Sequence, residues 1–284
     1  MAITLDYNFD APDADIILLS SDSAGGSTEF HLHQCILSAA SPFFHDMFSL
    51  PQGDHFTGKL PVIPISEPAH VIDILLRFVY PISRPAIASL DELCLVLGAA
   101  VKYDFGQAIL SLRTLLLTPR FLRSSPIRVY AVASQYDFIE EAEVAARHTL
   151  SVSLLDAPPC EDLKYINAYD YHQLLRLHQD RSAAAVSLLK TPENVKCMQC
   201  NGSVFTMHDA PKWWSHFENA ARKELEKRPT TDVVFGIDFV FKAARESGCS
   251  RCPESVLDSW KFLAGLKEVI DGLPAMISIR QAGR

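Results

Sequence analysis

The chain reads FHLHQCILSAASPFFHDMF from Phe30 to Phe48, and its hydrophobic period changes part-way along this stretch. Residues 29–33 alternate apolar and polar side chains, as a strand with one buried face does. From residue 35 onward the apolar side chains recur at helical spacing and share one face. The members of that face are Ile36, Ala40, Phe43, Phe44 and Met47. The stretch therefore predicts a strand followed directly by a helix over residues 35–48.

Short apolar runs lie on both sides of this stretch. Residues 15–21 (DIILLSS) predict a buried strand, and the Gly- and Ser-rich residues 23–28 predict a hairpin turn after it. Residues 60–65 alternate again and contain two prolines, which predicts a third strand at a sheet edge. Three helical stripes follow, namely Val71, Ile72, Leu75, Leu76 and Val79; Leu90, Leu93, Leu97 and Val101; and Ile109, Leu112 and Leu116. The sequence thus predicts an α+β domain in which helices flank a small mixed sheet.

Several of these residues also form an ordered set of anchors. The set is Phe30-x-x-His33-x-x-x-Leu37-x-x-x-Ser41-x-x-Phe44-x-x-Met47-Phe48, with Asp15 opening the strand before it and with Pro64-Ile65 and Ile74-Leu-Leu-Arg-Phe-Val-Tyr80 behind it. This pattern closely resembles that of the BTB/POZ family, and the resemblance covers about 105 residues. The later parts of the chain suggest a fungal-type member, in which a helical extension and a cysteine-pair module follow the BTB domain.

The resemblance implies homodimerisation through an apolar surface of the N-terminal strand and helix. The interface positions that it implies are Ile16, Phe43, Phe44, Met47 and Phe48. Each of them could equally belong to the core, which is the more frequent role of such residues. Many family members are also substrate adaptors of cullin-type ubiquitin ligases, and the matching surface lies around Phe48, Tyr80 and residues 89–103. The hydrophobic-x-Glu element that binds cullins is not visible between Tyr80 and Leu90.

Asp15 and His33 resemble a buried polar pair of the family. A His–Asp pair in a scaffold is more often a satisfied hydrogen bond of the core than a catalytic dyad. A dyad also needs an adjacent nucleophile, and Ser41 is expected to be a helix residue that packs. The sequence contains no nucleophile-elbow motif, Gly-rich dinucleotide turn or HExxH motif. We therefore expect no catalytic residue, and we expect that the protein is not an enzyme.

The second half of the chain is predicted to be mainly helical. Pro119 and Pro126 punctuate a linker of about six residues, an ordinary connection length. Residues 126–136 and 140–152 predict a helical pair, and Asp170 with Gln173 predicts the N-cap of a helix that runs to residue 190. The expected organisation is a tail over 1–12, a BTB/POZ domain over 13–120, a helical extension over 126–192 and a helical module over 193–284.

Two C-x-x-C pairs lie in that last module, beside small turn residues. They are Cys197 with Cys200 and Cys249 with Cys252. Pairs of this kind coordinate a tetrahedral zinc ion through their thiolates, and a bound metal ion stabilises a module of about 90 residues, which has a modest core. The sequence therefore predicts one structural Zn²⁺ shared by the four cysteines, although two separate sites stay open.

Other interpretations of the cysteines remain. The four thiols could be unligated, and His208 and His216 could substitute for one of them, although each histidine alone is more often a surface residue. The 48 residues between the pairs contain helical patterns over 211–228 and 231–245, and another helix is predicted from Pro253 to about residue 272. A thioredoxin-like redox pair is disfavoured because no βαβ pattern surrounds either C-x-x-C.

Composition and charge restrict the function further. Hydrophobic residues make up 48% of the chain and charged residues 21%, as in a folded domain. Residues 1–120 hold 13 acidic and 6 basic side chains, and the remainder holds 21 and 20, so nucleic acid is a poor default partner. No apolar run reaches the roughly 18 residues of a membrane span, and no secretory signal is visible. A cytoplasmic or nuclear location is expected, where seven cysteines do not indicate a disulfide framework.

These observations favour an adaptor or scaffold that dimerises, binds an unidentified protein and contains no chemistry of its own. An alternative is a BTB-type transcription regulator with a zinc-containing C-terminal module, which would need basic, DNA-reading fingers. A third is a zinc hydrolase or redox enzyme, although four sulfur ligands leave no open position on the metal.

Overall fold

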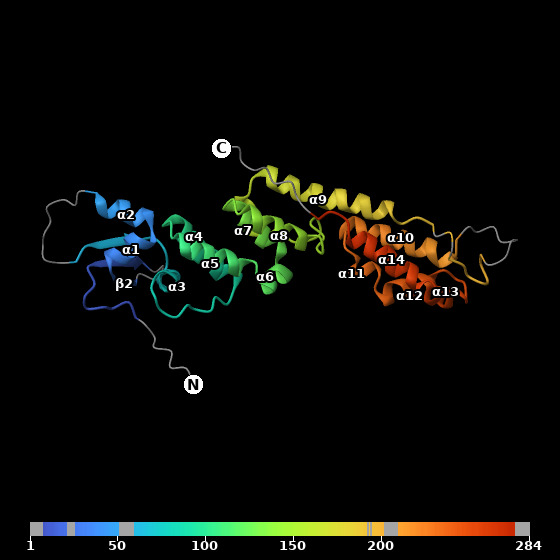
Figure 1. Cartoon of the computed structure of the whole chain (residues 1–284), viewed down its shortest axis with the longest axis horizontal. Helices are drawn as coiled ribbons and strands as arrows, with labels where there is room; N and C mark the ends of the chain where they lie inside the picture. Colours follow the sequence, from blue (N-terminus) through green and yellow to red (C-terminus); the bar gives the residue numbers. More distant parts are fainter. Residues whose placement is uncertain are drawn as a thin grey trace, which may run out of the picture. The chain divides into compact units, whose positions relative to one another are not determined.

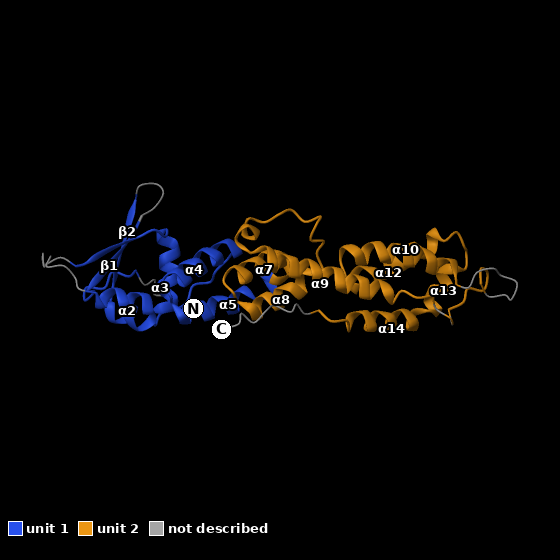
Figure 2. Cartoon of the chain, turned by 90° about the horizontal axis from the view of Figure 1, so that it is seen from above, with its two compact units in different colours: residues 1–121 blue, residues 122–284 orange. Residues whose placement is uncertain are grey.

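A computed structural model shows two compact units, residues 1–121 and residues 122–284 (Figures 1 and 2). Each unit is described by itself below. The structure describes residues 8–21, 26–50, 60–191, 193, 195–201 and 210–275. No helix among them combines the length and the apolarity that a membrane span requires.

A three-stranded mixed sheet organises the first unit. Its central strand β1 (Ile16–Ser21) pairs antiparallel with β2 (Ser27–Leu32) and parallel with β3 (Val62–Ile65). β3 lies at an edge of the described sheet, a position that tolerates Pro64 although this residue has no N–H to donate to a ladder. The helices of this unit are α1 (Gln34–Ala40), α2 (Pro42–Ser49), α3 (Ala69–Val79), α4 (Leu90–Lys102) and α5 (Gly106–Leu116). The predicted α+β fold is confirmed.

The helix predicted over residues 35–48 is in fact two helices that meet at Ser41. This residue has extended backbone (φ −143°, ψ 116°), because Pro42 disfavours helical geometry in the residue before it. The Ser41 hydroxyl accepts the backbone N–H of Phe44 at 3.1 Å and donates to the Tyr103 carbonyl at 2.6 Å. Ser41 is therefore the buried N-cap of α2 and a tie to the end of α4, not a helix residue.

The folded part of the first unit begins earlier than predicted. Phe9 is 2% exposed, and its ring lies edge-on against those of Phe30 and Tyr80, with centroids 6.1 and 5.4 Å away. Asp10 forms an isolated β-bridge with His31 on β2. These two residues thus belong to the fold, although residues 1–12 were expected to be a tail.

The first part of the second unit contains the expected helical pair, α7 (Pro126–Gln135) and α8 (Ile139–Thr149). A short helix, α6 (Pro119–Ser124), occupies the predicted linker. A 3₁₀ helix (Glu161–Tyr165) and the long helix α9 (Ala168–Ser187) follow. The N-cap of α9 is Asn167, whose side chain accepts the Asp170 N–H at 2.8 Å, so the cap lies three residues before the predicted one.

The remaining helices are α10 (Lys212–Lys227), α11 (Thr231–Val234), α12 (Ile237–Glu246), α13 (Cys252–Asp258) and α14 (Trp260–Asp271). Each of the last two predicted helices is therefore interrupted once. Trp213, Trp214 and Phe217 on α10 are fully buried and centre one apolar cluster with residues from α12, α13 and α14.

One buried cation joins α9 to the end of α14. The Arg181 guanidinium donates to the carbonyl oxygens of Pro229 at 3.0 Å, Ile270 at 3.2 Å and Pro274 at 3.1 Å, and also to that of Leu273. These carbonyls lie 48 to 93 residues away along the chain. Arg181 thus caps the C-terminal end of α14, where a positive charge is favourable.

Candidate functional site

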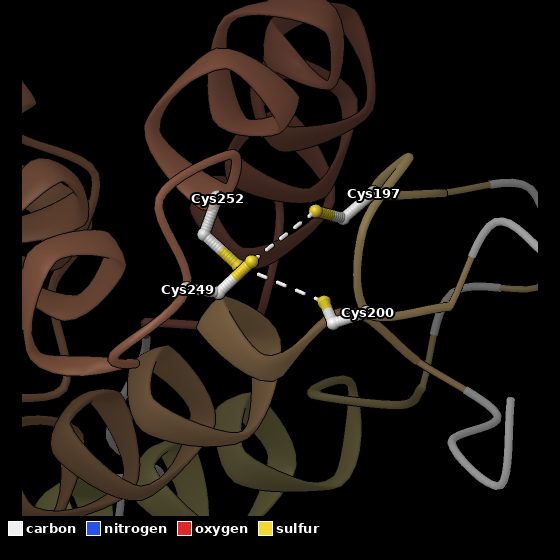
Figure 3. Close-up of side chains that lie close together, drawn as sticks. All are labelled: Cys197, Cys200, Cys249 and Cys252. Carbon is white, nitrogen blue, oxygen red and sulfur yellow. Dashed lines mark hydrogen bonds between the residues drawn. The ribbon is translucent and has the colours of Figure 1, made fainter.

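Four buried cysteines converge in the second unit (Figure 3). Cys197 and Cys200 lie in a turn before α10, whereas Cys249 follows α12 and Cys252 begins α13. The Cys197 and Cys249 sulfurs are 3.7 Å apart, and those of Cys200 and Cys252 are 3.8 Å apart. All four sulfurs lie within 4.8 Å of one another, so the two pairs form a single cluster.

The distances between these sulfurs fit a shared metal ion. Sulfurs of a disulfide are about 2.05 Å apart, and all four cysteines are free thiols. Four sulfurs placed about 2.3 Å from a central zinc ion form a tetrahedron with edges of about 3.8 Å. The two distances between the pairs match that edge. The cluster could therefore hold one tetrahedral metal ion.

Asn201 shapes the turn that contains the first pair. Its side-chain oxygen accepts the Cys197 N–H at 2.5 Å, and its amide nitrogen donates to the Val195 carbonyl at 3.2 Å. Its backbone N–H donates to the Cys197 carbonyl at 3.1 Å. In this turn the thiols of Cys197 and Cys200 both point toward the second pair (Figure 3). The sequence indicated only small turn residues beside each pair, so this role of Asn201 was missed.

Gly248 positions the second pair. It follows the C-cap of α12 with φ +67°, a left-handed conformation that ends many helices and that glycine adopts without strain. The chain then turns through Cys249 and enters α13, and the Cys252 N–H donates to the Cys249 carbonyl at 3.2 Å. Pro253 lies in the first turn of α13, where its missing N–H costs no helical hydrogen bond.

Burial and nearby N–H groups set the protonation of the thiols. Burial raises the pKa of Cys200 to about 12 and also raises the pKa of Cys252. Burial acts in the same direction on Cys249, but the N–H of Arg251 and the neighbouring thiols outweigh it and lower the pKa of Cys249. Four thiolates therefore need a cation in their midst, and a divalent metal ion supplies that charge.

A hydrogen-bonded chain behind the cysteines connects both turns to α10. The indole N–H of Trp213 donates to the Ser255 hydroxyl at 3.1 Å, and that hydroxyl donates to the Lys196 carbonyl at 2.8 Å. Ser255 lies one turn after Cys252 on α13, and Lys196 directly precedes Cys197. Such contacts behind a metal site hold its ligands in place, and no sequence pattern indicated them.

Of the two substitute ligands, the structure describes only His216, and it does not enter the cluster. His216 lies on an exposed position of α10, and His208 lies outside the described residues. Within the part of the chain that the structure describes, the cluster consists of the four cysteines alone.

The first unit presents an apolar stripe along α2. Phe43 is 44% exposed, Met47 is half-buried, and Leu50 is 62% exposed just after the helix. The spacing of these residues, four and then three, places them on one helical face. The inner side of the Phe43 ring lies against Phe44 and Tyr103, with centroid separations of 5.3 and 5.6 Å. The structure thus holds an exposed aromatic ring in a fixed position.

A comparison with known families identifies the first unit. The family model of the BTB/POZ domain matches residues 10–118. Residues 10–118 are a BTB/POZ domain. This domain is a protein-interaction module and is not typically catalytic, and BTB domains commonly dimerise and bind other proteins such as cullins. A comparison with curated proteins finds no match to the chain.

The expected Asp15–His33 pair of the BTB/POZ domain is wrong. The Asp15 carboxylate is exposed and accepts the backbone N–H of Gln34 at 2.7 Å, at the start of α1. The His33 ring lies 3.3 Å from the Asp13 carboxylate through Nε2 and 3.4 Å from the Tyr80 hydroxyl through Nδ1. The hairpin register, with Ile16 opposite Leu32, brings the two backbones together, but Gln34 at the start of α1 engages the Asp15 carboxylate.

The proposed interface positions of the BTB/POZ domain divide into two groups. Ile16 and Phe44 are each 1% exposed and belong to the core, so their side chains offer no surface to a partner. Phe43 is exposed, and Met47 and Phe48 are half-buried. Tyr80, which was expected in a cullin-docking surface, is also buried.

Proposed function

We propose that this protein is a non-enzymatic adaptor or scaffold. In this proposal the BTB/POZ domain joins two copies, and the second unit, held together by a structural zinc ion, binds a further protein in the cytoplasm or nucleus. The observation that carries the proposal is the match of residues 10–118 to a domain that commonly dimerises and binds proteins.

The α2 stripe of Phe43, Met47 and Leu50 is the surface on which we place the dimer contact. Full burial of one such side chain contributes about 1.5–3 kcal/mol, so covering an exposed aromatic and its neighbours supplies substantial affinity. Aromatic residues and methionine are also enriched at the centres of protein interfaces. The core residue Phe44 would support this surface from behind, because its ring packs against Phe43.

Light scattering on the eluate of a sizing column tests the dimer. At micromolar concentration we expect a mass of twice 31.6 kDa for the natural chain. The double variant Phe43→Asp, Met47→Asp should elute as a monomer with an unchanged circular-dichroism spectrum. Leu110→Asp on α5 is the matched control, because Leu110 is 52% exposed but lies outside the stripe. A natural chain that stays monomeric would remove the dimer from the proposal.

Zinc is the metal that we propose for the four-cysteine cluster. Thiolate-rich tetrahedral sites favour zinc, and a site with four protein ligands is structural rather than catalytic. We expect about one zinc ion per chain by elemental analysis after dialysis, and a clear loss of zinc and of stability in Cys249→Ser. Cys35→Ser is the control, because Cys35 lies in the first unit and is exposed. If Cys249→Ser retains both its fold and its zinc, the shared site is wrong.

A cullin-type ubiquitin ligase is the partner class that we propose to examine first. BTB domains commonly bind cullins, and the proposed surface combines half-buried Phe48 with Leu95 of α4, which is 53% exposed. Affinity purification from native cells should recover a cullin with the natural chain and not with Leu95→Asp. If the co-purifying proteins are identified thoroughly and no cullin is among them, the result would favour a scaffold that works without a ligase.

A further inference from the structure

A groove of about 770 Å³ opens beside α9 in the second unit. This volume lies within the range of about 300–1,000 Å³ that is typical of binding pockets. The apolar side chains that line it are Leu154, Leu155, Leu175, Ala183 and Val186. Leu155, in the loop after α8, is 84% exposed, which is unusual for a leucine with no cover.

The rim of the groove has an acidic excess. Asp156 on the loop pairs with Lys227 at the end of α10, with 3.3 Å between the carboxylate oxygen and Nζ. Glu226 is also part of the rim and is exposed. Two carboxylates and one ammonium group thus surround an apolar floor, and this arrangement favours an apolar segment that carries positive charge.

The described chain ends against α9, the helix that lines one side of this groove. Arg181 holds the carbonyls of Leu273 and Pro274, and two of its close neighbours on α9, His178 and Ser182, line the groove. The structure describes the chain as far as Ala275, and at least nine residues follow. Nine extended residues reach about 30 Å, so a segment that starts at Ala275 can lie along the groove.

The residues that follow have the chemistry that the groove favours. They read MISIRQAGR from Met276 to Arg284, with three large apolar side chains first, two arginines later and no acidic residue. Ile277 and Ile279 alternate with a serine, so an extended backbone places both on one side.

We propose that residues 276–284 bind this groove within the same chain. Their apolar side chains would lie against Leu175 and Val186, and their arginines would lie near the acidic rim. Any other apolar segment must then compete with the tail for the groove. This inference goes beyond the adaptor function and does not depend on the dimer or on zinc.

A labelled peptide with the sequence of residues 276–284 tests the proposal by fluorescence anisotropy. We expect it to bind a chain truncated after Ala275. The full chain should bind it at least about tenfold more weakly, because a tethered tail competes at an effective concentration on the order of millimolar. Should the truncated chain fold poorly, the full-length variant Ile277→Asp, Ile279→Asp opens the groove instead.

Two variants on α9 separate the groove from its surroundings. Ala183→Arg in the truncated chain fills the apolar floor and repels the basic peptide, so binding should be lost. Ser187→Arg is the control, because Ser187 is exposed on the same helix but does not line the groove. Equal peptide binding to the open and full-length chains, no binding to either, or equal loss in both arginine variants would overturn the proposal. Self-association of the truncated chain through the groove would also do so, since it would assign the groove to a second copy.

Discussion

Replacing Arg181 with Met should destabilise the second unit by about 3–4 kcal/mol. Methionine retains the length of the side-chain stem and a high helix propensity, so the variant removes mainly the guanidinium. At least three of its carbonyl partners lie within 3.0–3.2 Å, and a buried acceptor left without a donor costs about 1–3 kcal/mol. Burial lowers the pKa of Arg181, because desolvation destabilises the charged guanidinium. The variant no longer carries this desolvation cost, so the expected loss of stability is smaller than the summed cost of the unpaired carbonyls.

Urea titration followed by far-UV circular dichroism measures this loss. Arg176→Met on the same helix is the matched control, because its exposed pair with Asp180, at 3.8 Å, should contribute less than about 0.5 kcal/mol. The rate of amide hydrogen exchange should rise most over α14, because the carbonyls at its C-terminal end lose their donor. An Arg181→Met variant that falls within about 1 kcal/mol of the natural chain, or that matches Arg176→Met, would refute the role of Arg181 as a clamp.

Two further outcomes follow from contacts described above, and a third follows from the burial of His178. Ser41→Ala removes the cap of α2 and the donor to the Tyr103 carbonyl, so a loss of about 2 kcal/mol is expected in thermal melts, whereas Ser49→Ala, at an exposed hydroxyl, should change little. Asn201→Ala should speed zinc release to a colorimetric chelator by about tenfold or more, because contacts behind a metal site hold its ligands; unchanged release would leave Asn201 without that role. Burial lowers the pKa of His178 from 6.5 to about 4. As the pH falls from 6.5 to 4, this histidine is protonated in the unfolded chain before it is protonated in the folded chain, so the free energy of unfolding should fall by at most about 3 kcal/mol. His178→Gln should flatten that part of a pH–stability curve, and an unchanged slope would contradict the assignment.

Periodicity alone was enough to predict most elements of the fold. Alternation over residues 29–33 and 60–65 predicted two strands, and the stripes after residue 70 predicted α3, α4 and α5. The breaks within helical patterns were missed because a pattern records which side chains are apolar and not where the backbone changes direction. Ser41 shows this, since the apolar face of residues 35–48 continues across it while Pro42 turns the chain.

The candidate site was predictable as a set of ligands and not as a geometry. The spacing within each cysteine pair indicated a metal knuckle, but only the packing of α10, α12 and α13 brings the pairs together. Contacts over long sequence separations leave no local signal, and for that reason the roles of Arg181 and of the Trp213–Ser255 bond were not foreseen. The Asp15–His33 pair failed because the Asp15 carboxylate accepts the Gln34 N–H at the start of α1 and Asp13 lies beside the imidazole ring, and no sequence pattern indicated either contact.

The separation of the two cysteine pairs also sets an order of events while the chain is being made. A ribosome adds about 5–20 residues per second, so Cys252 is synthesised roughly 3–10 s after Cys200. During that interval the nascent chain has half of the cysteine cluster, while the BTB/POZ domain has already emerged from the ribosome and is free to fold and to form the dimer that we propose. Completion of the second unit then waits on the supply of the ion that we propose. With the zinc site and the dimer that we propose, a cell short of zinc would accumulate chains that are paired through the first unit and open to proteases in the second.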